Sequence, residues 1–162
     1  EQLAKMMTDT FRREWKSLDG TANRNIHEIV TMASLVEKES GVPAERPVVS
    51  SVYWNRLRQG MRMECDPTTI YAAMLRGRWR GTIYKSDLEN EHPYNTYKNK
   101  GLPPGPIANP GREAIRAALH PAETKYIYFV AKGDGSGGHN FAEGFADHQR
   151  NVSSYRKNRE GQ

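Results

Sequence analysis

Residues 26–39 are the segment that most constrains the fold. Five apolar side chains recur there at helical spacing and form one continuous arc: Ile26, Ile29, Val30, Ala33 and Val36. Asn25 and Glu28 are placed as a capping box before this arc, and Gly41 and Pro43 follow it. The pattern predicts a helix over 26–39 that packs one face against a core.

Helical patterns recur along the rest of the chain. We expect further helices at about 3–18, 44–59, 66–75, 111–119 and 143–157. Asp66 and Asn109 each precede a proline, which is typical of an N-cap followed by the first helical position. Helices therefore dominate the predicted fold.

Strand patterns are fewer and shorter. They predict a small antiparallel sheet with strands near 61–65, 125–131 and 138–142. Residues 76–108 are rich in Gly, Pro, Asn and Tyr, and we predict a long ordered loop there because proline restricts the backbone. The expected fold class is α+β, a mainly helical domain with a small antiparallel sheet.

Length and composition limit the function classes. The 162 residues fit an N-terminal helix (1–20) that leads into one domain (21–162). Cys65 is the only cysteine, which excludes an internal disulfide and a cysteine-based metal site. The five histidines lack a recognised metal spacing, and no glycine-rich nucleotide loop is present, so we expect no metal and no cofactor. The net charge of +5 suits an anionic partner, and no apolar run is long enough to span a membrane.

One acidic residue stands out on the helix predicted over 26–39. Glu37 falls inside the apolar arc, one turn after Ala33, whereas Glu28 and Glu39 fall on or beside the polar face. Burial raises the pKa of a carboxyl, and a glycosidase needs such a protonated acid. The alternative is that Glu37 pairs with a buried Arg or Lys, or accepts backbone N–H bonds from a loop.

Four blocks in order carry a resemblance to a known family. They are ASLVEKES (33–40) and the segments at 48–72, 94–111 and 118–143. Together they closely resemble the endolytic murein transglycosylases of the YceG-like family, over about residues 26–155. The resemblance implies that the first glutamate of the VEKE segment, Glu37, is catalytic. It also implies that the chain, which starts at Glu1, is part of a longer protein with one N-terminal transmembrane helix and a LysM-like module. The catalytic domain would then lie on the periplasmic side of the inner membrane.

The resemblance further implies a lytic transglycosylase reaction. Glu37 would protonate the oxygen between N-acetylmuramic acid and N-acetylglucosamine, and the C6 hydroxyl of the sugar would attack C1 while Glu37 accepts a proton. The product is a 1,6-anhydro muramyl end. The expected partners are peptidoglycan glycan strands and cell-wall synthases, and no nucleic acid.

Polar and aromatic residues in the same blocks are the candidates for substrate binding. The candidates are Tyr94, Asn95, Thr96, Tyr97, His139, Asn140, Asn55 and Asp66. Amide, hydroxyl and aromatic groups suit the acetamido groups and faces of sugars. Structural roles stay open for them: loop anchoring in the YNTY block (94–97), hydrogen bonding by His139 and Asn140, and helix capping by Asp66. Asn55 would approach the cleft or brace Glu37.

Three other functions compete with this interpretation. A hydrolytic muramidase would pair Glu37 with a second carboxylate such as Glu64, Asp66 or Asp87. A peptidoglycan-binding module would need no catalytic residue. A nucleic-acid binder would use six arginines beside Trp54 and Trp79: Arg56, Arg58, Arg62, Arg76, Arg78 and Arg80. We rank all three below the transglycosylase.

Overall fold

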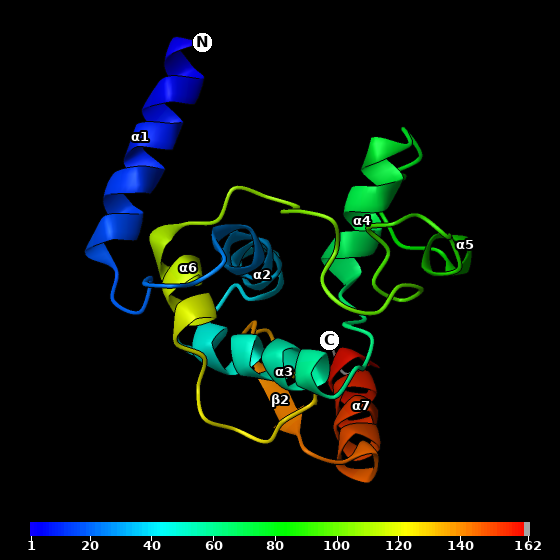
Figure 1. Cartoon of the computed structure of the whole chain (residues 1–162). Helices are drawn as coiled ribbons and strands as arrows, with labels where there is room; N and C mark the ends of the chain where they lie inside the picture. Colours follow the sequence, from blue (N-terminus) through cyan, green and yellow to red (C-terminus); the bar gives the residue numbers. More distant parts are fainter. Residues whose placement is uncertain (161–162) are drawn as a thin grey trace.

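The computed structural model describes residues 1–160 and shows a mainly helical α+β fold, as predicted (Figure 1). Residues 161–162, the end of the expected domain, lie outside the described residues. The elements are α1 (Gln2–Ser17), α2 (Ile26–Glu39), the short 3₁₀ helix η1 (Pro43–Glu45), α3 (Arg46–Arg58), α4 (Asp66–Leu75), α5 (Lys85–Leu88), α6 (Arg112–Leu119), β1 (Tyr128–Ala131), β2 (His139–Ala142) and α7 (Phe145–Glu160).

The central element is α2, whose predicted bounds are confirmed. The Asn25 side chain accepts a hydrogen bond from the Glu28 backbone N–H at 3.3 Å, which fixes the start of the helix. Seven of its residues are buried: Ile29, Thr31, Met32, Ala33, Ser34, Leu35 and Val36. This run surrounds the helix rather than marking one stripe, because α6, α3 and α4 all pack against α2.

The predicted strand at 61–65 was wrong. Within the described residues, this segment makes a single bridge, Arg62 to Lys100, instead of a strand. The buried Arg56 donates Nη1 hydrogen bonds of 3.0 Å to the carbonyl oxygens of Arg62 and Met63, so α3 holds groups that a neighbouring strand would use. Glu64 has a φ of 52°, in the left-handed region, which a continuous strand does not allow.

The other two predicted strands are confirmed with shorter bounds. β1 and β2 pair antiparallel, with Tyr128 opposite Ala142 and Ala131 opposite His139. The sheet packs on α3 through Tyr53 and Phe129, whose rings meet edge to face at 5.8 Å. Helix α7 covers the sheet and begins at Phe145, slightly later than predicted.

Most of the segment 76–108 lies with α4 to one side of the central helices, and its last part returns to α2 (Figure 1), where the Ile107 backbone N–H donates to Ser34 Oγ at 3.0 Å. It contains one short helix, α5, and is otherwise irregular. Asn95 and Thr96, in the middle of the segment, are 0% and 1% exposed. A loop with buried polar side chains is held in one arrangement by their hydrogen bonds, which agrees with the prediction of an ordered loop.

Helix α1 projects away from the rest of the molecule (Figure 1). It has no fully buried residue, and only its second half packs on the core, through Phe11 and Trp15. Among residues 1–160 there is no helix with the length and apolar character that crossing a membrane requires.

Candidate active site

Glu37 lies at the surface of the core, where α2 meets the start of α6. Its side chain is 28% exposed, so the prediction of a carboxyl buried on the apolar arc was wrong. One carboxylate oxygen accepts a hydrogen bond from the Gly111 backbone N–H at 3.0 Å, and the other lies 3.5 Å from the Arg46 guanidinium. Because Gly111 is the N-cap of α6, Glu37 satisfies a free amide at the positive end of that helix. Both alternative roles that the sequence left open are present in this arrangement.

Glu39, the last residue of α2, is the carboxyl with the more perturbed environment. Burial raises its pKa, and the nearby Asp66 carboxylate raises it further. The Cys65 thiol donates to its Oε2 at 3.5 Å and, like Tyr53 and His139, opposes the rise in pKa. The sequence places Glu39 on or beside the polar face of α2. The contact with Cys65 could not be expected from that position, because it forms where the start of α4 packs against the end of α2.

Two buried side chains, Tyr53 and Cys65, lie beside Glu39. Tyr53 and Cys65 are 0% and 1% exposed, and burial together with the neighbouring Glu39 charge raises the pKa of both well above the ordinary values. Both side chains therefore remain protonated at neutral pH. The Tyr53 hydroxyl acts on Glu39 electrostatically, but its geometry is not that of a formed hydrogen bond to any group within residues 1–160.

The side chains around Glu39 form a cluster that consists of Glu45, Tyr53, Cys65, Asp66, Tyr97 and His139. Asp66 and Tyr97 are hydrogen-bonded to each other within it. The Tyr97 hydroxyl donates a 2.6 Å hydrogen bond to Asp66 Oδ1. Burial and the Asp66 charge raise the Tyr97 pKa, so the phenol keeps its proton and Asp66 remains its acceptor. Asp66 does not cap α4, since the N-cap residue is Cys65 and no side chain caps this end. The capping role considered for Asp66 was wrong, and its carboxylate belongs to the cluster.

His139 reaches the same cluster from the sheet. Its Nδ1 lies 2.8 Å from Glu45 Oε2, and its backbone N–H donates to both oxygens of that carboxylate at 3.1 Å. Its side chain is only 10% exposed. Glu45 thus fixes the His139 imidazole beside Glu39. The imidazole in turn acts to lower the pKa of Glu39.

Three predicted binding residues are structural in this fold. The Asn55 amide donates to the carbonyl oxygens of Thr124 (2.9 Å) and Tyr126 (2.8 Å), so it braces the chain before β1 rather than Glu37. Asn95 is enclosed by its own loop. Thr96 Oγ1 accepts from the Cys65 backbone N–H at 3.0 Å and so positions the start of α4.

The two remaining predicted residues have no interaction with Glu39 among the described contacts. Tyr94 packs against Tyr71 with ring centroids 4.8 Å apart. Asn140 follows His139 on β2 and therefore points to the opposite face of the sheet. The cluster thus keeps three of the predicted residues: Tyr97, His139 and Asp66.

Four residues of the cluster were not predicted: Glu39, Tyr53, Cys65 and Glu45. The one available sequence signal was the position of Glu39 as the last helical residue before Ser40 and Gly41. At the end of a helix, the apolar arc does not determine which side chains are buried, because the neighbouring chain can cover the final turn or leave it exposed. No group of three or more metal-binding side chains occurs among residues 1–160.

The fold and the cluster define a mainly helical α+β domain that holds a partly buried carboxyl with a raised pKa at the end of its central helix. The model of the YceG-like family matches residues 1–154, and the chain belongs to this family.

Similar proteins are found in several bacteria. An endolytic murein transglycosylase of Bacillus subtilis (strain 168) is 44% identical over 128 residues, which cover 79% of this chain and 35% of that protein. One from Streptococcus pneumoniae serotype 2 is 33% identical over 138 residues, or 82% of this chain and 24% of that protein. A yceG-like protein from Listeria monocytogenes, with a crystal structure at 2.6 Å, superposes with a TM-score of 0.74 at 36% identity; the match covers 92% of this chain and 46% of that chain. The chain therefore spans about a third or less of the curated relatives.

Proposed function

We propose that this chain is the catalytic part of an endolytic lytic transglycosylase that cleaves peptidoglycan strands, with Glu39 as the general acid and base. The relatives named endolytic murein transglycosylase support the reaction class. The observation that carries the choice of residue is the partly buried Glu39 carboxyl, which contacts the Cys65 thiol and whose pKa is raised by desolvation and by the nearby Asp66.

The proposed reaction needs one residue that first gives and then takes a proton. Protonated Glu39 donates to the glycosidic oxygen between N-acetylmuramic acid and N-acetylglucosamine, and the C1–O bond breaks. The C6 hydroxyl of the muramyl sugar then bonds to C1 and gives its proton to the Glu39 carboxylate. The enzyme is regenerated, and the new end is a 1,6-anhydro sugar. The nucleophile belongs to the substrate, so its proximity supplies part of the rate.

The neighbouring groups suit this chemistry. Positive charge develops at C1 in the transition state, and the Asp66 side chain near Glu39 is an acidic group that would stabilise it. Tyr97 holds Asp66 by its 2.6 Å hydrogen bond, and Glu45 holds His139. These contacts keep the cluster in place while Glu39 changes its protonation state.

Glu37 is the weaker candidate, although the family resemblance of the sequence favoured it. Its carboxylate already serves the Gly111 amide and the Arg46 guanidinium. Both contacts hold the Glu37 side chain at this junction, whereas the Glu39 carboxyl has the raised pKa that suits a general acid. We therefore assign Glu37 a structural role at the junction of α2 and α6.

A hydrolytic muramidase is the second candidate, because Asp66 supplies another carboxylate next to Glu39. Asp87 does not fit that role, since it accepts hydrogen bonds from the Tyr84 backbone N–H and from Arg80, which lower its pKa. The products separate the two reactions.

Mass spectrometry of the products from uncrosslinked glycan strands tests the proposal. Muropeptides one water lighter than hydrolysis products, absent with Glu39→Gln, are the expected result. Full-mass reducing ends would establish the hydrolase instead, and no cleavage by the wild-type chain would reject both. The inner-membrane anchor, the periplasmic location and the association with cell-wall synthases, all implied by the resemblance, belong to the same proposal for the whole protein.

A further inference from the structure

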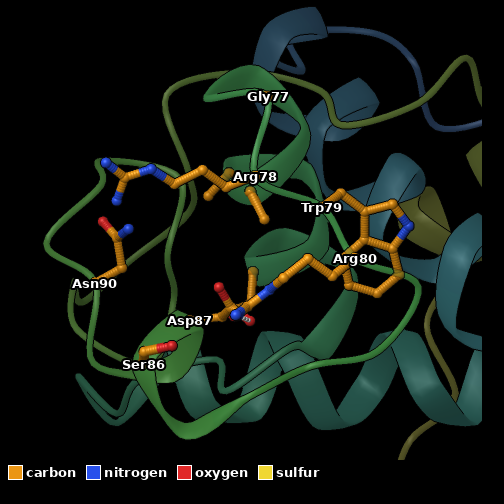
Figure 2. A pocket seen from close by; sticks show the side chains of 10 residues that line it. Gly77, Arg78, Trp79, Arg80, Ser86, Asp87 and Asn90 are labelled. Carbon is orange, nitrogen blue, oxygen red and sulfur yellow. Dashed lines mark hydrogen bonds and ion pairs between the residues drawn. The ribbon is translucent and has the colours of Figure 1, made fainter.

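A polar pocket lies between α4, α5 and the chain that joins them, and the residues of the cluster around Glu39 do not line it (Figure 2). It encloses about 400 Å³. Buried residues on one face of α4, namely Thr69, Ala72 and Ala73, line it together with Arg78, Trp79, Arg80, Ser86, Asp87 and Asn90. It is in the size range of small-molecule and peptide-fragment sites.

Asp87 is the one carboxylate among the described residues that line the pocket, and one of its oxygens accepts two hydrogen bonds. Asp87 Oδ2 accepts from the Tyr84 backbone N–H at 2.9 Å and from Arg80 Nη2 at 3.1 Å. The Arg80 guanidinium also lies over the Tyr84 ring at 3.9 Å. Arg80 and Asp87 therefore neutralise each other and shape the wall of the pocket.

Three residues of the pocket lining have unengaged groups that can donate hydrogen bonds. Within residues 1–160, no hydrogen bond or ion pair engages the Arg78 guanidinium, the Ser86 hydroxyl or the Asn90 amide nitrogen. The Asn90 amide oxygen is already used by the His92 backbone N–H at 3.0 Å. Figure 2 shows Arg78, Ser86 and Asn90 on one side of the pocket and the Trp79 ring on the other. A positively charged set of donors opposite an aromatic wall matches a carboxylate attached to a short organic chain.

The pocket is within reach of the cluster along α4. Asp66 is in the first turn of α4, and Ala73, which lines the pocket, is seven residues further on. At about 1.5 Å per helical residue, this separation is about 10 Å. An extended peptide covers about 3.3 Å per residue, so a peptide of three to five residues attached to a sugar near Glu39 spans that distance.

We infer that this pocket, with Arg78 as its anchor, binds the free carboxylate of the peptide branches that a peptidoglycan strand carries. The inference rests on the proposed function for the identity of the strand. Arg78 is then a specificity residue that distinguishes peptide-bearing strands from bare ones. It does not take part in bond cleavage.

Two measurements test the inference independently of each other. The first follows Trp79 by tryptophan fluorescence and indole N–H NMR while a synthetic stem pentapeptide with a free C-terminal carboxylate is added to the chain. The matched probe is the same peptide with a C-terminal amide. We expect saturable binding of the acid, at least about tenfold weaker binding of the amide, and loss of acid binding in Arg78→Gln. The control Arg76→Gln removes an equal charge close by in a residue that does not line the pocket, and it should bind the acid like the wild type.

The second measurement compares KM for peptide-bearing strands and for strands stripped of peptides by an amidase. Arg78→Gln should raise KM for the peptide-bearing strands about tenfold relative to the stripped strands, with kcat little changed, because the contact is the same in the ground and transition states. Equal effects on both strands, or equal binding of acid and amide peptides, would overturn the inference. If the wild type cleaves neither strand, the proposed function fails, while the peptide titration still decides whether the pocket binds a carboxylate.

Discussion

Replacing Asn95 by alanine removes the main anchor of the segment 76–108. The Asn95 side chain is buried, and its amide and carbonyl are both used. Its nitrogen donates to the carbonyl oxygens of Asp87 (3.2 Å), Leu88 (2.9 Å) and Asn90 (2.7 Å), and its oxygen accepts from Thr69 Oγ1 (3.2 Å) and the Tyr97 N–H (3.0 Å).

The magnitude follows from these contacts. The side chain has two N–H groups and two lone pairs, so it satisfies about four hydrogen bonds at once, with one N–H shared. At about 1 kcal/mol for each bond, Asn95→Ala should lower the free energy of unfolding by about 4 kcal/mol. For a chain of this size, that loss corresponds to a fall in Tm of about 10 °C.

Urea unfolding followed by far-UV circular dichroism measures this loss. The matched control is Asn99→Ala in the same loop, an exposed asparagine whose amide donates to the carbonyl oxygens of His92 (2.9 Å) and Asn95 (3.1 Å). The control should lose less than about 1 kcal/mol. Similar losses for both variants would refute the structural role of Asn95, as would a variant that keeps its stability but no longer binds glycan.

Other predictions concern stability and pH. Arg56→Leu should lower the free energy of unfolding by about 4 kcal/mol in urea titration, because the carbonyl oxygens of Arg62, Met63 and Ile127 lose their donor; a loss below about 1 kcal/mol would contradict this. Because burial raises the pKa of Glu39 in the folded chain, stability should fall as pH rises from the ordinary glutamate pKa through the raised one. Glu39→Gln should therefore be more stable than the wild type at pH 8, with a difference that disappears near pH 4; a constant or inverted difference between thermal unfolding curves would contradict this sign. Cleavage should also decline on the alkaline side as Glu39 loses its proton, and a rate that stays level with rising pH would count against an acid role.

The helices could be predicted from the sequence because their signals are local. Caps, prolines and 3.6-residue periodicity gave α2 its observed bounds and placed α4 and α6 within about one residue. The strand predicted at 61–65 failed because its alternating pattern did not reveal that Arg56 would take the carbonyl oxygens of Arg62 and Met63. Arg56 belongs to α3, so its hydrogen bonds to these carbonyl oxygens cannot be read from the pattern of residues 61–65 alone.

The prediction of Glu37 as the catalytic residue stays a prediction, and the sequence pattern did not single out Glu39 for a related physical reason. Helical periodicity describes which side of α2 faces the core, and it placed Glu37 correctly on the side of apolar residues. Burial at the end of α2 instead depends on the start of α4, where Cys65 contacts Glu39. Asp66, Tyr97 and His139 were found as candidates because polar side chains in the matched blocks are visible in sequence, but their arrangement around Glu39 depends on tertiary packing.

The central claim, that Glu39 and not Glu37 transfers the proton, is tested most directly by comparing two variants. Glu39→Gln and Glu37→Gln are both neutral isosteres in the same helix, and circular dichroism checks that each is folded. Initial rates of anhydro-end formation from uncrosslinked strands are then measured by mass spectrometry. We predict that Glu39→Gln loses at least about a thousandfold in rate, while Glu37→Gln keeps activity within about tenfold of the wild type. A large loss in Glu37→Gln with an active Glu39→Gln would contradict the account and return the catalytic role to Glu37.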